Sequence, residues 1–255
     1  MKDADTCSSS ALDSISFYED DAVLASYLKE RDRADGPKLA IEEQIVLRFL
    51  GNLTGCSVLD LGCGDARIGR AALRAGALHY VGLDGSRRMI ELARQSLIGT
   101  SGVVRLQNLE NWRGEPAERF DIVVSQLALQ YITNLSHIFE AVRKQLKPRG
   151  IFVFSVEHPL ITSSFKGQFE NDIAASWCVR RYFREGSRVN AWLNSAVVKQ
   201  HRTLQTYFAE LRRCGFQLDR FSEGWPDPDN FPDRAIYEQR LEVPICAIFR
   251  ARLEQ

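Results

Sequence analysis

A glycine turn at the end of a short apolar stretch constrains the fold of this chain more than any other feature. Residues 58–65 read VLDLGCGD, which predicts a buried strand ending in an acidic residue and two glycines. A helical pattern follows from residue 66 to residue 75 and stops at Gly76. Strand, glycine turn and helix form the unit by which a doubly wound α/β sheet brings its backbone close to a nucleoside-like ligand.

The spacing of the glycines departs from the dinucleotide fingerprint, which reads G-x-G-x-x-G. Gly62 and Gly64 are followed by Gly69, and Arg67 stands where the third glycine of the fingerprint would be. Asp60, at the end of the strand, would repel a pyrophosphate and suit a cationic ligand or one with N–H donors. The spacing therefore argues against an NAD(P)-dependent oxidoreductase, which is kept as the alternative enzyme class.

Strands and helices alternate after this turn, as is typical of a mainly parallel sheet. Strands are predicted at 57–61, 79–83, 103–107, 120–125, 151–156, 216–221 and 245–250. Helices are predicted at 87–97, with Ser86 as its cap, and at 135–146 and 203–214. Two further helices, within 17–28 and 40–50, precede the first strand and would cover a ligand site.

The alternation breaks after Glu157, where residues 158–202 form an insert that is too long for an ordinary loop. We expect residues 178–184 and 195–201 to pair as a hairpin around the turn 185–187, on the substrate side of the sheet. Residues 1–16 are polar and predict a flexible tail, which leaves residues 17–255 as one domain.

Composition excludes several classes of function. The chain has 33 basic and 33 acidic residues, so no net charge draws it to nucleic acid. Its six cysteines are scattered without a C-x-x-C pair, which predicts reduced cysteines, no metal site and a cytoplasmic protein. No apolar run approaches the ~18 residues that span a membrane. We expect a monomer or homodimer that acts on a small molecule.

The run 58–65 resembles the first motif of the class I S-adenosylmethionine-dependent methyltransferases, of the type that acts on small molecules. The resemblance covers residues 41–250 and is strongest over 58–92. It implies a Rossmann-like, doubly wound, seven-stranded sheet whose last pair of strands forms a reversed edge, with the last strand antiparallel. It also implies S-adenosyl-L-methionine as the cofactor.

The resemblance assigns candidate roles around that cofactor. Asp84 would take both ribose hydroxyls, its alternative being a helix cap or a solvated loop charge. Met89 would pack on the adenine, or belong to the ordinary helix core. Asn108 stands where the family often has Asp. The residues expected to bind the cofactor are Asp60, Gly62, Gly64, Asp84, Gly85, Met89, Asn108, Leu109, Ser125, Gln126 and Arg31.

Within that set, the backbone N–H of Leu109 would meet an adenine ring nitrogen, and Ser125 and Gln126 would line the methionine part and the sulfonium. Arg31 or Arg33 would pair with the methionine carboxylate, although a solvated charge run explains these arginines equally well.

On the acceptor side, His158 and His201 are the candidate general bases, with Glu157 and Glu223 as weaker ones. The alternatives are a hydrogen-bonded turn residue before proline for His158 and a hairpin-end residue for His201. Aromatic residues of the insert would cover a planar acceptor, or simply pack a hairpin: Trp177, Tyr182, Phe183 and Trp192. We therefore expect methyl transfer to an O or N nucleophile of a small aromatic or heteroaromatic metabolite. A non-methylating protein that binds the same cofactor, as a partner subunit or a cyclase, is the other alternative.

Overall fold

The computed structural model describes residues 12–32, 41–163, 179–193 and 195–253. Its main element is a seven-stranded sheet with the order β3-β2-β1-β4-β5-β9-β8. The strands are β1 (Ser57–Leu61), β2 (His79–Asp84), β3 (Val103–Leu106), β4 (Phe120–Gln126), β5 (Leu146–Glu157), β8 (Phe216–Ser222) and β9 (Cys246–Leu253). Strands β1 to β5 are parallel, and β9 is antiparallel to both β5 and β8. The predicted fold is confirmed, with the detail that β9 alone is reversed at the edge.

Helices cover both faces of this sheet because its central strands are apolar on both sides. The helices are α3 (Glu43–Leu50), α4 (Arg67–Arg74), α5 (Arg87–Ser96), α6 (Leu135–Gln145) and α8 (Leu204–Arg213). Val58 and Ile122 belong to one buried cluster, which also contains side chains of α3, α4 and α5. Their neighbours Leu59 and Val123 belong to the opposite cluster, with side chains of α6 and α8. The sheet is therefore doubly wound.

The strand order indicates at which edge of the sheet a ligand would bind. After β1 the chain builds β2 and β3 on one side, and it then crosses to β4 on the other side of β1. This reversal makes the carboxyl ends of β1 and β4 the topological switch point, which is where doubly wound sheets bind their ligands. The glycine turn follows β1 at this edge.

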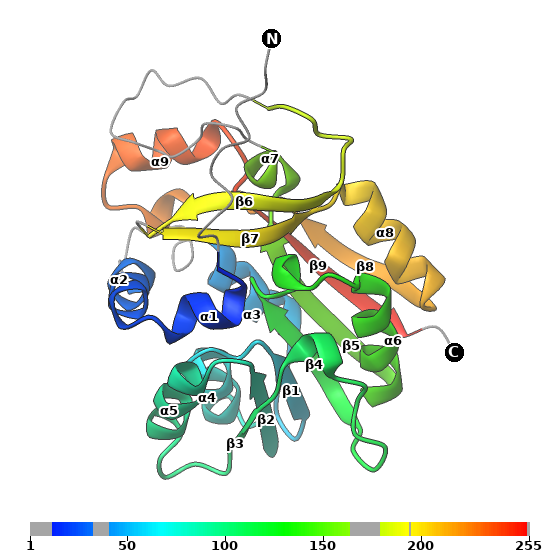
Figure 1. The fold of residues 1–255 in the computed structure, drawn as a ribbon. Helices are drawn as coiled ribbons and strands as arrows, with labels where there is room; N and C mark the ends of the chain where they lie inside the picture. Colours follow the sequence, from blue (N-terminus) through cyan, green and yellow to red (C-terminus); the bar gives the residue numbers. More distant parts are fainter. Residues whose placement is uncertain (1–11, 33–40, 164–178, 194, 254–255) are drawn as a thin grey trace.

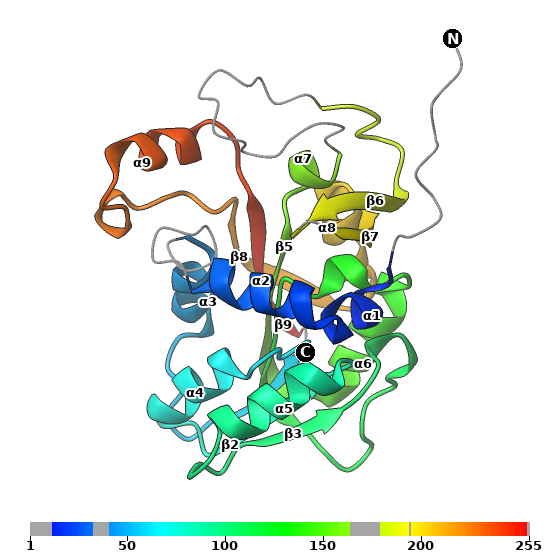
Figure 2. The same ribbon diagram turned by 60° about the vertical axis from the view of Figure 1, so that its left-hand side comes forward.

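Two short helices lie over the same edge. Helix α1 (Ser14–Glu19) begins after the N-cap Asp13, and α2 (Asp21–Arg31) begins after the N-cap Asp20. In both views they lie between α5 below and the strands β6 (Gly186–Trp192) and β7 (Ser195–His201) above (Figures 1 and 2). The single helix predicted over 17–28 is thus two helices, because Asp20 caps a new one. The predicted tail overlaps α1, and residues 1–11 lie outside the described residues.

The hairpin differs from its prediction. Its second arm, 195–201, is confirmed, but its partner is Gly186–Trp192 rather than 178–184. The sequence interpretation took Gly186 for the turn, whereas this glycine begins the strand and pairs with His201. The chain reverses after Trp192, at Leu193, whose φ is +50°. Among the described residues, five short helical elements were not predicted: α7 (Pro159–Thr162), α9 (Arg234–Leu241), η2 (Leu109–Asn111), η3 (Leu129–Tyr131) and η4 (Pro228–Asn230).

Candidate active site

The glycine turn has the conformation that its sequence requires. Gly62 and Gly64 have φ values of +75° and +54°, a region that glycine enters without steric cost. A Cβ on Gly62 would lie 2.3 Å from the Cβ of Ala128, so the turn packs closely against the chain after β4. At Gly64 a Cβ would meet nothing within 4 Å. The backbone of Gly64 therefore faces open space, as a ligand-binding turn must.

Asp84 joins the glycine turn to the start of α5. Its Oδ2 accepts the N–H of Gly64 at 2.9 Å, and its Oδ1 accepts the N–H of Ser86 at 2.9 Å. Ser86 in turn caps α5 by accepting the N–H of Met89 at 3.2 Å, as predicted. Burial raises the pKa of Asp84, although the N–H groups that it accepts oppose this rise. Each carboxylate oxygen keeps a further acceptor position for a ligand hydroxyl.

Asp60 and Gly69, on either side of the glycine turn in the chain, both contact Tyr80 of β2. Asp60 is 1 % exposed, and its Oδ2 accepts the hydroxyl of Tyr80 at 2.8 Å. A Cβ on Gly69 would lie 2.4 Å from the ring of Tyr80. The third glycine is therefore explained by the close packing of α4 on Tyr80 of β2, a contact between two elements that sequence reasoning missed.

The residues expected around the adenine lie beside α5 and η2. Met89 and Leu109 are buried. The Oδ1 of Asn108 accepts the N–H of Glu110 at 2.9 Å, so this side chain caps η2. A Cβ on Gly85 would lie 2.8 Å from Ile15 of α1. Helix α1 therefore packs directly on the backbone that follows Asp84.

Ser125 and Gln126 end β4 and are tied to neighbouring elements. The Ser125 hydroxyl donates to the carbonyl oxygen of Leu61 at 2.8 Å, within the sheet. The Gln126 amide donates to Oε2 of Glu42 at 2.5 Å, and the hydroxyl of Ser155 in β5 donates to the other carboxylate oxygen. Sequence reasoning missed the buried Glu42. Glu42 is the N-cap residue of α3, and its spacing four residues before the buried Val46 is the signal that would have found it.

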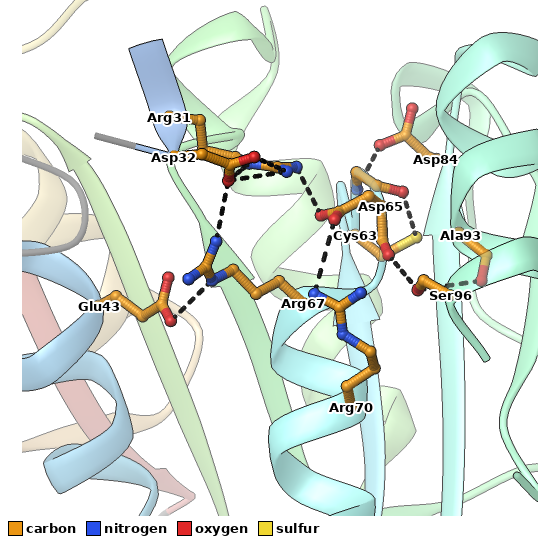
Figure 3. Close-up of polar contacts among 11 residues, drawn as sticks. Arg31, Asp32, Glu43, Cys63, Asp65, Arg67, Arg70, Asp84, Ala93 and Ser96 are labelled. Carbon is orange, nitrogen blue, oxygen red and sulfur yellow. Dashed lines mark hydrogen bonds and ion pairs between the residues drawn. The ribbon is translucent and has the colours of Figure 1, made fainter. Parts of the chain in front are cut away.

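Arg31 links the end of α2 to the glycine turn (Figure 3). Its guanidinium lies 2.9 Å from Oδ1 of Asp65, the residue after Gly64, and 3.0 Å from Asp32. The Arg31 side chain is only 8 % exposed, so the interpretation as a solvated charge is wrong. Arg67 extends the network by pairing with Asp32 at 3.2 Å and Glu43 at 3.0 Å. Arg33 lies outside the described residues.

Both candidate histidines use both ring nitrogens inside the protein. Nδ1 of His158 accepts the N–H of Leu160, and its Nε2 lies 3.1 Å from Glu223. His201 lies 2.7 Å from the Thr162 hydroxyl through Nδ1 and 2.8 Å from the Tyr182 carbonyl oxygen through Nε2.

The two histidines also share an electrostatic environment. Burial lowers the pKa of both, although the partners Glu223 and Tyr182 respectively oppose this effect. The neutral form that results satisfies one donor and one acceptor contact in each ring. This arrangement favours the structural roles, a helix-capping turn residue and a hairpin-end residue, over a general base.

Aromatic side chains from four elements gather over the carboxyl edge. Tyr18 of α1 contacts Tyr27 of α2, with ring centroids 5.2 Å apart, and Trp192 of β6 at 6.3 Å. Its ring also lies 6.5 Å from that of Tyr131 in η3. Of the insert aromatics that the sequence suggested, Trp192 joins this cluster, whereas Phe183 is 88 % exposed. Tyr182 contacts His201, and Trp177 lies outside the described residues.

The described residues lack two other features that would indicate a different kind of protein. No helix among them is long and apolar enough to cross a membrane. Within the same part of the chain, no group of three or more His, Cys, Asp or Glu side chains is arranged to hold a metal ion.

The fold and this edge define a nucleoside-binding α/β protein of the Rossmann-like class. A methyltransferase domain family matches residues 52–206, and the chain belongs to that family. It is 31 % identical over 218 residues to an uncharacterised protein of Haemophilus influenzae, a match that covers 82 % of this chain and 86 % of the relative. Its cofactor is S-adenosyl-L-methionine, as in the solved S-adenosylmethionine-dependent methyltransferase from Mesorhizobium loti. That structure has 31 % identity and a TM-score of 0.77, over 86 % of this chain and all of the other.

A shorter match links the chain to a relative whose methyl transfer is directed to oxygen. The ubiquinone biosynthesis O-methyltransferase of Proteus mirabilis is 33 % identical over 105 residues, which are 40 % of this chain and 42 % of that enzyme. These comparisons favour a methyltransferase over an NAD(P)-dependent oxidoreductase.

Proposed function

We propose that this methyltransferase transfers the methyl group to an O or N nucleophile of a small aromatic or heteroaromatic molecule. The observation that carries this proposal is the aromatic cluster of Tyr18, Tyr27, Tyr131 and Trp192, which lies over the carboxyl edge of the sheet. Such rings stack on planar molecules. The match to an O-methyltransferase that acts in ubiquinone biosynthesis supports the same acceptor class.

The residues at this edge fit the cofactor. Asp84 would hold the ribose hydroxyls, and the backbone of Gly64, which faces open space, would pass the methionine part. Arg31, already buried beside Asp65, would hold the methionine carboxylate. When bound, the cofactor supplies a methyl group activated by a sulfonium. The protein then has to align the acceptor and exclude water, and we assign this task to helices α1 and α2 and to the β6–β7 hairpin.

The proposal also concerns the setting of the reaction. The protein would act in the cytoplasm as a monomer or homodimer, without nucleic acid or membrane. With no net charge, the chain provides no overall field for an anionic polymer, which supports this view.

The test combines binding with turnover. Calorimetry should show tight binding of S-adenosylhomocysteine, and a labelled methyl donor should yield labelled product with a panel of phenols, aromatic amines and imidazoles. The non-methylating alternatives predict tight binding of the cofactor with no labelled product from any acceptor, and that result would refute methyl transfer to this class.

A further inference from the structure

A buried ion pair lies at the acceptor side of the carboxyl edge. Glu157 is the last residue of β5, and its Oε1 lies 2.5 Å from Nζ of Lys199 in β7. The Lys199 side chain is only 4 % exposed. Oε2 of Glu157 is buried and accepts no hydrogen bond from the described residues. Buried carboxylate oxygens almost always have a donor, so this oxygen is available to a donor that a ligand brings.

The pair lies within the aromatic cluster. Nζ of Lys199 lies 4.9 Å from the ring centroid of Trp192. Tyr131 is within electrostatic reach of both Lys199 and Glu157, and its hydroxyl pairs with that of Tyr18. Strand register places Glu157 two residues beyond Ser155, which lies opposite Gln126 at the end of β4.

The same cluster extends to the cofactor side. Tyr18 belongs to α1, whose Ile15 packs on Gly85, the residue after Asp84. Tyr131 is held in place because Arg202, which follows β7, donates to the carbonyl oxygens of Ile132 and Thr133. The aromatic cluster therefore links the ion pair to α1, the helix that packs beside Asp84.

We propose that Glu157 is the general base and Lys199 the oxyanion-stabilising cation for a phenol or enol hydroxyl that is held among Tyr18, Tyr131 and Trp192. This inference rests on the proposed function and narrows its acceptor to an oxygen nucleophile. It also replaces the two histidines as candidate bases, since both nitrogens of each are already bonded.

The chemical step balances with these groups. The acceptor oxygen attacks the methyl carbon, the carbon–sulfur bond breaks, and its electron pair stays on sulfur to give the neutral thioether. The hydroxyl proton passes to Oε2 of Glu157. As the proton moves, negative charge shifts from the carboxylate to the acceptor oxygen, so the ammonium of Lys199 stays beside a counter-charge until the oxygen is methylated. The product ether and the protonated Glu157 are both neutral, and loss of that proton to solvent then restores the ion pair with Lys199.

The test uses acceptors of different acidity. Wild-type protein should transfer a labelled methyl group to 4-methylphenol and to the more acidic 4-nitrophenol. Glu157→Gln should lower kcat/KM for 4-methylphenol by about 100- to 1,000-fold, the range of general-base catalysis. The loss with 4-nitrophenol should be below about tenfold, because this acceptor ionises without help. The affinity for S-adenosylhomocysteine should not change in calorimetry.

Two further variants make the test specific. Glu140→Gln, in which a carboxylate paired with Arg213 on the exposed surface of α6 is removed, should leave both rates unchanged. If Glu157→Gln does not fold, Glu157→Asp keeps Lys199 paired and moves the carboxylate back by one methylene. For this variant we expect the loss of kcat/KM to be again larger with 4-methylphenol than with 4-nitrophenol, by a smaller margin than for Glu157→Gln.

Aniline and imidazole complete the panel and separate the possible failures. An equal loss with both phenols would show a structural role for Glu157 and overturn the assignment. Transfer to aniline or imidazole but to neither phenol would overturn the oxygen-directed class while the proposed function stands. Transfer to no acceptor, with the cofactor bound, would overturn the proposed function itself.

Discussion

Replacing Asp84 with alanine tests the assignment on which the cofactor side of the site depends. A hydrogen bond to a charged group contributes about 1.5–3 kcal/mol. Losing two ribose hydroxyl contacts should therefore cost about 3–6 kcal/mol, and the partial exposure of Asp84 favours the lower value. At about 1.4 kcal/mol per factor of ten, we expect the Kd of S-adenosylhomocysteine to rise about 100-fold or more.

The same substitution should also weaken the folded protein. The N–H groups of Gly64 and Ser86 each lose an acceptor at 2.9 Å, which should lower the free energy of unfolding by about 1–3 kcal/mol. Calorimetry with S-adenosylhomocysteine measures the first effect, and urea unfolding of the protein without cofactor measures the second. Both are needed because a loosened turn would also bind poorly.

Asp121 provides the matched control at the opposite edge of the sheet. Its carboxylate accepts the backbone N–H of Ser57 at 2.8 Å, the Ser57 hydroxyl at 2.7 Å and the Lys147 ammonium at 2.8 Å. Asp121→Ala should therefore lower the free energy of unfolding by a similar amount and leave the Kd unchanged. A Kd for Asp84→Ala within about threefold of wild type would refute the ribose assignment. An equal rise in Kd for both variants would attribute the effect to general loosening.

Three further substitutions test separate parts of the structure. Gly69→Ala places a Cβ 2.4 Å from the Tyr80 ring, and this overpacking should lower the free energy of unfolding by about 1–3 kcal/mol; an unchanged urea midpoint would contradict it. Burial lowers the pKa of His201 below its ordinary 6.5, so the unfolded state binds the proton first and stability should fall as pH drops below 6.5, by up to about 1.4 kcal/mol per pH unit. His201→Gln should flatten this part of the urea-unfolding profile, and an unaltered slope would count against the buried neutral ring. Arg31→Met should weaken S-adenosylhomocysteine binding by about tenfold in calorimetry. The control Arg88→Met breaks an exposed ion pair, of the kind that contributes about 0–1 kcal/mol, and should weaken binding less than twofold. Equal effects of the two variants would refute a specific role for Arg31.

The sheet could be predicted from sequence because the residues that specify each strand and turn are neighbours in the chain. The central strands contain short apolar runs, such as residues 122–124 of β4, and β1 has the predicted bounds Ser57–Leu61. The positive φ of Gly62 and Gly64 follows from a turn whose residues are adjacent in the chain. The hairpin was predicted with the wrong first arm because a glycine suits both a turn and the start of a strand, and only pairing with His201 decides between them.

The histidines show where reasoning from residue type fails. An imidazole suggests a base, but its availability depends on partners that come from other segments. His201 meets Thr162 and Tyr182, which precede it by 39 and 19 residues. These tertiary contacts occupy both ring nitrogens of His201, and no pattern in the neighbouring residues predicts them.

The cofactor side of the site could be predicted from sequence better than the acceptor side, again because of the difference between local and tertiary contacts. The turn and Asp84 lie within about thirty residues of one strand–turn–helix–strand unit, so one local pattern specifies where the cofactor binds. The acceptor side that we propose uses Tyr18, Tyr131, Glu157 and Lys199, which come from α1, η3, β5 and β7 and meet only through the full topology. Proteins that share the strand–turn–helix–strand unit can therefore share the cofactor. Changes in helices α1 and α2 and in the β6–β7 hairpin can alter the acceptor without disturbing the sheet.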